Sequence, residues 1–436
     1  MTTTRFALAI ALAGCGRVGF SEIAGPSGSD AGADSATAAD GATGDTVTLV
    51  VTSDEYLNEP AGLPIAGATV LVERSTGTDR MVTDATGRAQ FAAAGVIACH
   101  VIYQSTIGWR GYTVQPPPAG TIELGSRPAF NQNHGMTFAL PSNATASDYT
   151  VRLPEHCASP PYSGSPSVQF NYAPACEGAT IHAVGFVRTQ VGSGLPDLYL
   201  DAGMVTLRNG ATQQVTGSYQ QLPTRTLQLT DLPSGATSVA AGVVARAGLD
   251  LTPLSPSIDS FTPSGGAVTV QEEVAPGGNT LGIGASGGLP PQYITSSELL
   301  APLSSATAAT FSAKDMLPLF ESMTITDPTQ ISWTGAAGGT ITIVEHVGGD
   351  FQWDWYLPPS ATVARLPAIP PDLGVPAPQV PPDASVTKLA VPGAAGGDLV
   401  PTIDRRWPAW PHDALLLPAA GGAWTQILYS AAIGPP

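Results

Sequence analysis

Lysine is almost missing from this chain: only Lys314 and Lys388 occur among its 436 residues. Charged residues make up 12% of the sequence, and the formal net charge is −17. Proteins that bind nucleic acid neutralise phosphates with clustered lysine and arginine. This charge balance therefore argues against a nucleic-acid partner and favours a soluble protein that anionic surfaces weakly repel.

Long hydrophobic runs and metal-binding motifs are also lacking. Beyond the N-terminus, no apolar stretch reaches the roughly 20 residues that a membrane-spanning helix needs. The six histidines are scattered, and none stands in an H-E-x-x-H arrangement, so the sequence lacks this zinc-peptidase motif. The sequence predicts no metal and no cofactor.

Glycine and proline are abundant instead, with 49 and 41 residues. Proline does not fit inside helices or central strands, and glycine weakens both. Short segments such as 46–52 and 96–103 alternate apolar and polar residues, which is the period of a half-buried strand. We therefore predict an all-β fold, with several immunoglobulin-like or transthyretin-like β-sandwich domains in series after a disordered tether.

The N-terminus has the order of a secretory signal: one basic residue, Arg5, and then the apolar run Phe6–Ala13. Residues 12–15, Leu-Ala-Gly-Cys, resemble the lipobox of bacterial lipoproteins. The resemblance implies a signal peptide over residues 1–14, cleavage before Cys15 and acylation of its thiol, palmitate included. Gly16 stands where aspartate would favour the inner membrane, so the resemblance implies anchoring in the cell outer membrane.

Residues 15–45 are predicted to form the lipidated cysteine and a flexible linker. From residue 21 onward this segment is mostly alanine, glycine, serine and aspartate, without aromatic or basic residues. Such a segment buries too little apolar surface to offset the entropy lost on ordering. The alternative interpretation of the whole N-terminus is a short apolar segment that contains a cysteine by chance.

Residues 46–125 carry a second resemblance. The sequences PIAGATVLVE at residues 64–73 and VTDATGRAQF at residues 82–91 are similar to the carboxypeptidase regulatory-like domain. The resemblance implies a transthyretin-like β-sandwich with an accessory role. It implies no catalytic residue.

Three further regions are predicted. Residues 126–285 are predicted to form a β-sandwich-like domain. Residues 325–436 are predicted to form a C-terminal β-sandwich-like domain. Residues 286–324 read as a connector with two short helices, which Ser297 and Ser312 could cap.

Cys157 and Cys176 are the candidate disulfide. An exported chain favours disulfides, and this one would close a loop of about 20 residues, which stabilises by on the order of 3 kcal/mol. The alternatives are free thiols, or a metal site with His156 and His182, whose spacing matches no standard zinc pattern. Cys99 lies on the apolar face of a predicted strand, where we expect a buried, unreactive thiol.

The sequence FQWDWY at residues 351–356 is the richest aromatic stretch. At strand period, its phenylalanine shares one face with Trp353 and Trp355. Three aromatics on one face form either a sandwich core or, because aromatic faces stack on sugar rings, a glycan-binding patch. Trp407 and Trp410, beside prolines, are the other ligand-binding candidates.

Two motif matches lack their structural context. Residues 282–287 match G-x-G-x-x-G, and residues 284–288 match G-x-S-x-G. Both motifs require a helix to follow, whereas Leu289-Pro290-Pro291 begins none. The pairs that remain for carboxylate chemistry are Glu272 with Glu273, and Glu345 with Asp350 and Asp354, whose separations depend on the fold.

Together these observations predict a non-enzymatic, lipid-anchored cell-envelope protein with a structural, adhesion or binding role. One alternative is a carbohydrate-binding surface lipoprotein that uses exposed tryptophans. Another is a hydrolase of unrecognised type. The expected partners are the membrane, through the lipid anchor, and a glycan or an envelope protein.

Overall fold

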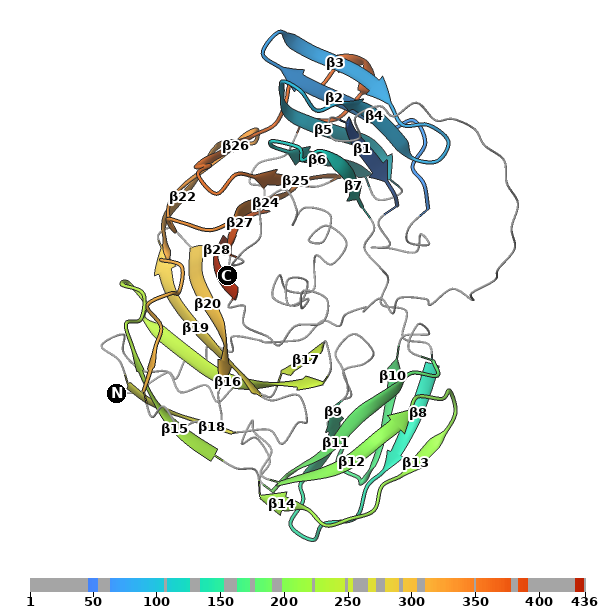
Figure 1. Cartoon of the computed structure of the whole chain (residues 1–436), viewed down its shortest axis with the longest axis vertical. Helices are drawn as coiled ribbons and strands as arrows, with labels where there is room; N and C mark the ends of the chain where they lie inside the picture. Colours follow the sequence, from blue (N-terminus) through green and yellow to red (C-terminus); the bar gives the residue numbers. More distant parts are fainter. Residues whose placement is uncertain are drawn as a thin grey trace, which may run out of the picture.

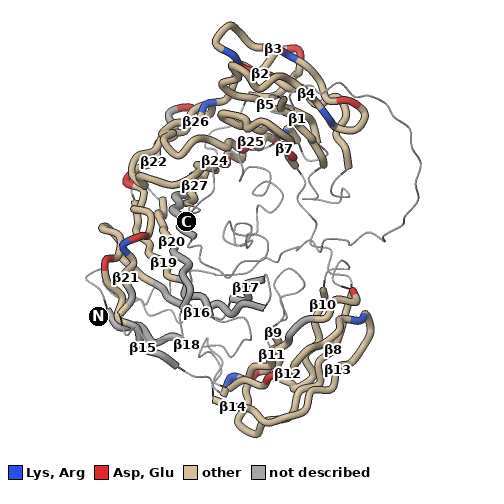
Figure 2. Tube along the Cα trace, viewed as in Figure 1, with Lys and Arg blue, Asp and Glu red and all other residues tan. Residues whose placement is uncertain are grey.

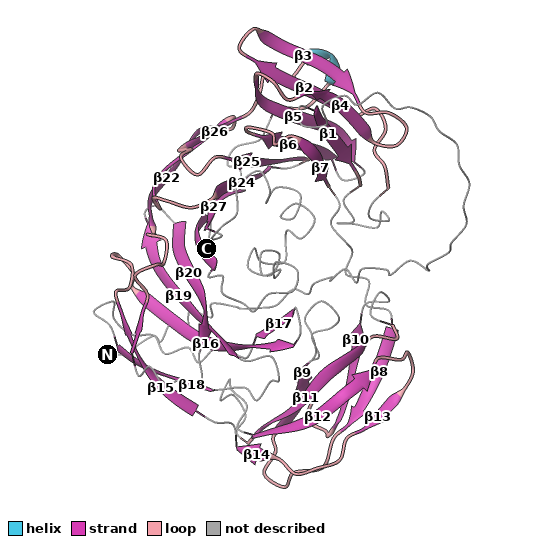
Figure 3. Cartoon of the chain, viewed as in Figure 1, coloured by secondary structure: helices cyan, strands magenta, loops and turns pink. Residues whose placement is uncertain are grey.

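The computed structural model describes sixteen stretches of the chain: residues 46–53, 63–105, 108–125, 134–152, 163–172, 177–189, 198–221, 224–247, 250–253, 266–271, 279–289, 293–303, 310–348, 350–377, 383–390 and 428–434. In these stretches the only helix is one 3-10 turn, η2 (Pro371–Leu373), and the rest is strand and loop (Figure 3). The all-β prediction is confirmed. Over the same stretches, no helix has the length and apolar character needed to span a bilayer.

The first group of strands is a two-layer sandwich. One layer has the order β4-β1-β7, and the other contains β3, β2, β5 and β6. The bounds are β1 (Thr46–Val51), β2 (Thr69–Arg74), β3 (Gly77–Val82), β4 (Arg88–Ala92), β5 (Val96–Ser105), β6 (Gly108–Val114) and β7 (Gly120–Leu124). Alternate residues of β1 (Val47, Leu49 and Val51) are fully buried against the second layer, as a period of two predicts.

A second sandwich forms its own core. Its two sheets have the orders β10-β8-β13 and β14-β12-β11-β9. The bounds are β8 (His134–Ala139), β9 (Asp148–Arg152), β10 (Ser167–Tyr172), β11 (Thr180–Arg188), β12 (Leu198–Thr206), β13 (Thr212–Gln214) and β14 (Gln220–Gln221). Phe138, Val168 and Tyr172 are fully buried between the sheets.

The remaining strands build a long sheet and two small ones. The long sheet has twelve strands in the order β17-β16-β19-β20-β28-β27-β24-β25-β6-β5-β2-β3, and Figure 1 shows it curving from β17 round to β3. Its strands from the second half of the chain are β16 (Ser238–Ala247), β17 (Asp250–Pro253), β19 (Asn279–Leu289), β20 (Tyr293–Leu303), β24 (Ile341–Gly348), β25 (Phe351–Leu357), β27 (Asp383–Ala390) and β28 (Leu428–Gly434).

The two small sheets have the orders β18-β15-β21 and β22-β23-β26. Their bounds are β15 (Thr224–Thr230), β18 (Gly266–Gln271), β21 (Thr310–Ser312), β22 (Phe320–Asp327), β23 (Gln330–Gly335) and β26 (Val363–Arg365). The second of them packs on one face of the long sheet, where Phe320, Ile331 and Trp333 meet Trp353 and Trp355.

The predicted helices at residues 286–324 are wrong. Ser297 lies within β20, which pairs with β19 on one side and β28 on the other, and the Ser297 hydroxyl donates to the carbonyl of Leu317 at 2.6 Å. Ser312 ends the short strand β21. Neighbouring strands satisfy these backbone groups, so tertiary pairing overrides the local helical pattern. The predicted boundary after residue 285 likewise falls inside β19.

One strand pair joins the first sandwich to the C-terminal region. Strand β25 runs parallel to β6, with Phe351 opposite Trp109 and Tyr356 opposite Val114. The core of the first sandwich therefore continues onto β24, β25 and β27, through Ile343 among others. The sequence does not reveal this pairing.

The Trp353 indole locks this junction. Its Nε1 donates to Thr113 Oγ1 across the two strands at 2.9 Å, and Thr113 Oγ1 lies 2.9 Å from His100 Nδ1. The ring occupies the space above Gly111, where a Cβ atom would lie 2.0 Å from the indole Cε3. Glycine at 111 is thus what allows a fully buried tryptophan to cross the junction.

We expect Gly111→Ala to destabilise the protein by about 1–3 kcal/mol, because the added methyl overpacks a closed core. Urea unfolding followed by tryptophan fluorescence measures the change. Gly288→Ala is the matched control, since Gly288 is also in a strand and a Cβ there meets no atom within 4 Å. Equal unfolding midpoints for Gly111→Ala and the unsubstituted protein would contradict the proposed lock.

Candidate functional site

The aromatic run is a core and not a glycan platform. Trp353 is 0% exposed and Trp355 is 2% exposed. Their ring centroids lie 6.0 Å apart, and the Phe351 centroid lies 5.8 Å from that of Trp353. The Trp355 Nε1 donates to the carbonyl of Arg365 at 3.0 Å. The three aromatic residues share one face, as predicted. The prediction that Trp353 and Trp355 bind a ligand is wrong, because covered rings cannot stack on a sugar.

Several other predicted site residues lie outside the described stretches. They are Cys15, Cys157, Cys176, Glu272, Glu273, Trp407 and Trp410. Cys99 is described, and it is buried with a free thiol. Burial raises the pKa of Cys99 to about 12, so the thiol stays protonated and unreactive, as expected for this position.

The carboxylates Glu345 and Asp354 do come together. They are directly opposite each other in the β24–β25 ladder, on the face opposite to that of the tryptophans. Glu345 Oε2 accepts from the Ser385 hydroxyl at 3.3 Å, and Asp354 Oδ1 lies 3.4 Å from Gln352 Nε2. Asp354 is 2% exposed. Asp350, the third member of the predicted set, lies in the turn between the two strands and bonds the Trp109 N–H through its backbone carbonyl.

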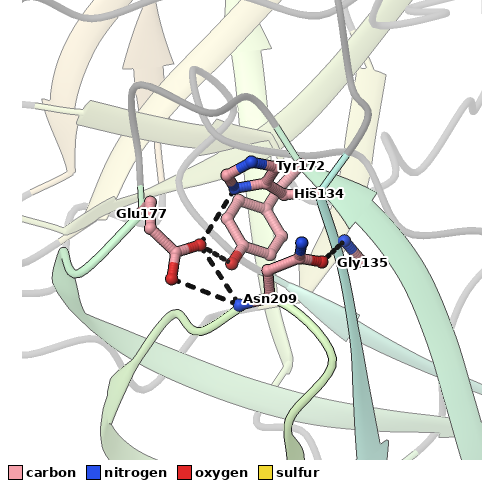
Figure 4. A network of polar contacts seen from close by, with 5 residues as sticks. All are labelled: His134, Gly135, Tyr172, Glu177 and Asn209. Carbon is pink, nitrogen blue, oxygen red and sulfur yellow. Dashed lines mark hydrogen bonds and ion pairs between the residues drawn. The ribbon is translucent and has the colours of Figure 1, made fainter.

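A separate polar network lies at one end of the second sandwich, centred on the carboxylate of Glu177 (Figure 4). Its Oε2 accepts a hydrogen bond from the hydroxyl of Tyr172, and it lies 3.0 Å from His134 Nδ1. Both carboxylate oxygens accept from the backbone N–H of Asn209, at 3.1 and 3.3 Å. Asn209 Oδ1 in turn accepts from the Gly135 N–H at 2.8 Å.

Four separate segments supply this network. His134 begins β8, Tyr172 ends β10, Glu177 precedes β11, and Asn209 lies in the turn between β12 and β13. Because these ends belong to both layers of the sandwich, the carboxylate closes one end of its core. The His134 ring also packs edge-on against the Tyr172 ring, with centroids 5.7 Å apart.

Contacts within this network shift the pKa values of Glu177 and Tyr172. The Tyr172 hydroxyl first, and then the Asn209 N–H and the His134 imidazole, lower the pKa of the Glu177 carboxyl. Burial, followed by the nearby carboxylate, raises the pKa of Tyr172. The side chain of Glu177 is 40% exposed and that of His134 is 28% exposed, so solvent and polar solutes reach both.

Chemically, this cluster is an anionic polar clamp. The lowered pKa keeps its carboxylate ionised at neutral pH, and the Tyr172 hydroxyl and the Asn209 N–H donate to it. Sequence reasoning did not single out His134, Tyr172, Glu177 or Asn209, because they come from four segments with no motif between them. Across the described stretches, no group of three or more His, Cys, Asp or Glu side chains could hold a metal ion.

The wider distribution of charge is sparse. Figure 2 shows lysine, arginine, aspartate and glutamate spread along the described strands and loops, with long uncharged stretches between them. One pair on the surface joins Arg80 of β3 to Asp372 of η2, at 2.7 Å between Nη1 and Oδ2. An exposed pair of this kind contributes little to stability.

No protein-family model matches this chain, and no curated protein matches it. Among solved structures, it is similar to the Bacillus anthracis TIE protein, with 8% identity, a TM-score of 0.14, and coverage of 58% of this chain and 45% of that one. It is also similar to a streptococcal ancillary pilin, with 9% identity, a TM-score of 0.15, and coverage of 62% and 98%.

A third structure is a Ca²⁺-stabilized adhesin that helps an Antarctic bacterium reach out and bind ice. It shows 10% identity, a TM-score of 0.12, and coverage of 79% of this chain and 94% of that one. All three TM-scores are far below those of chains that share a fold.

We expect the stability of Glu177→Gln to depend less steeply on pH, at acidic pH, than that of the unsubstituted protein. A carboxyl whose pKa is lowered by folding stabilises the folded state above its unfolded pKa of about 4.3, and that contribution is lost as pH falls through the folded pKa. Replacing Tyr172 with Phe removes the strongest donor and has the same effect in part. Urea midpoints between pH 3 and pH 7 measure both variants.

Glu321→Gln, at an exposed position of β22, is the matched control for this series. Its profile is expected to follow that of the unsubstituted protein. A clamp role for Glu177 would be refuted if the profiles of Glu177→Gln and Glu321→Gln coincide at every pH.

Proposed function

We propose that this protein is a non-enzymatic, lipid-anchored protein of the cell envelope whose β-sheet modules serve a structural, adhesion or binding role. The observation that carries the proposal is the β6–β25 pairing, which continues one sheet from the first sandwich into the C-terminal region. A single twelve-stranded sheet suits a scaffold that transmits load or presents a surface, because its strands are held edge to edge by backbone hydrogen bonds.

The positions of the aromatic and carboxylate side chains also support a structural role. Trp353 and Trp355, which an aromatic binding site would expose, fill the core instead. The Glu177 carboxylate, which a polar site would offer to substrate, accepts hydrogen bonds from its own neighbours. Each of these groups contributes to cohesion between layers.

The proposed attachment rests on the N-terminal sequence. The N-terminus has the order that lipoprotein processing requires: Arg5, then an apolar run, then the Leu-Ala-Gly-Cys sequence that ends at Cys15. Multiple acylation of one cysteine holds a protein firmly to a bilayer, whereas a single chain holds it weakly. The acidic, lysine-poor linker after Cys15 would keep the sandwiches away from an anionic membrane surface.

Expression of the full chain in a Gram-negative host tests the anchor. We expect the mature protein to begin at an acylated Cys15 by mass spectrometry and to fractionate with the outer membrane. Globomycin should leave the precursor uncut, and Cys15→Ser should lose the acyl groups, whereas Cys99→Ser should keep them. A chain that still begins at Met1 without fatty acid would end the lipoprotein proposal.

The non-enzymatic part has its own test. The purified protein is assayed against panels of glycoside, ester and peptide substrates, and we expect no turnover. Turnover that Glu345→Gln or Asp354→Asn abolishes would overturn this part of the proposal, because those two side chains form the carboxylate pair across β24 and β25.

A further inference from the structure

His346 is a titratable group buried without a polar partner. It lies on β24, opposite Trp353 of β25 and Ala384 of β27, and it is 0% exposed. Its ring stands edge-on to Phe351 and to Trp355, with centroid distances of 5.7 and 6.3 Å. Neither ring nitrogen has a hydrogen-bond partner among the described residues. Buried imidazoles normally bond at least one nitrogen, so this arrangement calls for a physical explanation.

The imidazole faces the interface between two layers. His346 shares its face of β24 with Val344, since alternate residues of a strand point the same way. That face packs against the small sheet β22-β23-β26 in one apolar cluster. The residues that meet there from the two layers are Val344, Phe351, Trp353, Trp355 and Val386 on one side, and Phe320, Met323, Ile331, Trp333 and Ala364 on the other.

Another base lies on this face of the sheet. Lys388 of β27 is 4% exposed, and its Nζ donates to the carbonyl of Pro359 at 2.8 Å. It is opposite Thr342, whose buried hydroxyl also lacks a partner. Burial lowers the pKa of both Lys388 and His346.

The described acidic side chains of the packed strands lie elsewhere. In the small sheet, Glu321 and Asp327 of β22 are exposed, as is the cation Arg365 of β26. Glu345 and Asp354 occupy the opposite face of β24 and β25. Farther along the same face, on β5, His100 has Thr113 and Glu73 as partners, whereas no carboxylate among the described residues bonds to His346.

We propose that protonation of His346 releases the β22-β23-β26 layer from the long sheet, so that mildly acidic pH opens this interface. A charged imidazole inside an apolar layer is strongly disfavoured, and separation of the layers hydrates it. The opened state exposes the aromatic surface of Phe351, Trp353 and Trp355. This inference does not depend on the lipid anchor.

Proton linkage fixes the direction and the size of the pH effect on this interface. The imidazole has an ordinary pKa of about 6.5 when hydrated, and burial lowers that pKa in the closed state. The closed state is therefore fully favoured above pH 6.5 and is lost as pH falls below it. The opening equilibrium constant therefore rises as pH falls from 7.5 to 5, and titration of the hydrated imidazole limits this rise to about 30-fold.

Hydrogen exchange of the full chain, read by mass spectrometry at pH 7.5 and pH 5 and corrected for intrinsic rates, tests the proposal. Protection in peptides covering β22, β23 and β26 is expected to fall by up to about 30-fold at pH 5, while that of the second sandwich holds. His346→Phe, which keeps an aromatic ring, should remove this fall. Glu321→Gln, at an exposed position of β22, should leave it unchanged.

Two results would overturn the proposal. One is an equal pH-dependent fall in His346→Phe and the unsubstituted protein. The other is loss of protection in all modules together, which would indicate general acid unfolding. Should His346→Phe fail to fold, His346→Leu and the pH dependence of tryptophan fluorescence in the unsubstituted protein answer the same question, because Trp333, Trp353 and Trp355 all become hydrated when the layers separate.

Discussion

The parallel pairing of β6 with β25 is the constraint on which the rest of the structure depends. It joins strands 240 residues apart, as the bond between Trp353 and Thr113 records. Closing so long a loop costs entropy, although the cost grows only slowly with length. Burial of a whole indole, whose apolar surface is among the largest of any side chain, helps offset it, and the absent side chain of Gly111 makes the room.

From that junction, strand β25 serves two cores at once. Tyr356 belongs to the core of the first sandwich, whereas Trp353 and Trp355 belong to the core beneath the small sheet. The period-two alternation of a strand makes this division possible. It also means that a disturbance on one face, such as a charge on His346, lies one backbone thickness from the other core.

Two polar networks of the described residues connect neighbouring strands and layers. The Glu177 carboxylate gathers donors from four segments at one end of the second sandwich. The Thr113 hydroxyl links the Trp353 indole to His100 across three strands. The buried contacts of Thr113 favour one register over others, because a slipped register would leave these groups unpaired. Among the described residues, Trp333, Thr342 and His346 have buried polar atoms without partners, and of these only the His346 imidazole can take up a proton.

The sequence by itself determined the β character, through abundant glycine and proline and short alternating segments. It also determined which residues of 351–356 share a face, because a strand has a fixed period. Only the tertiary structure decided that Trp353 is covered, that Ser297 lies in a strand, and that Glu177 meets His134. Those outcomes depend on which strands become neighbours, and neighbours so distant in the chain leave no local pattern, because each strand carries the same signal whatever it pairs with.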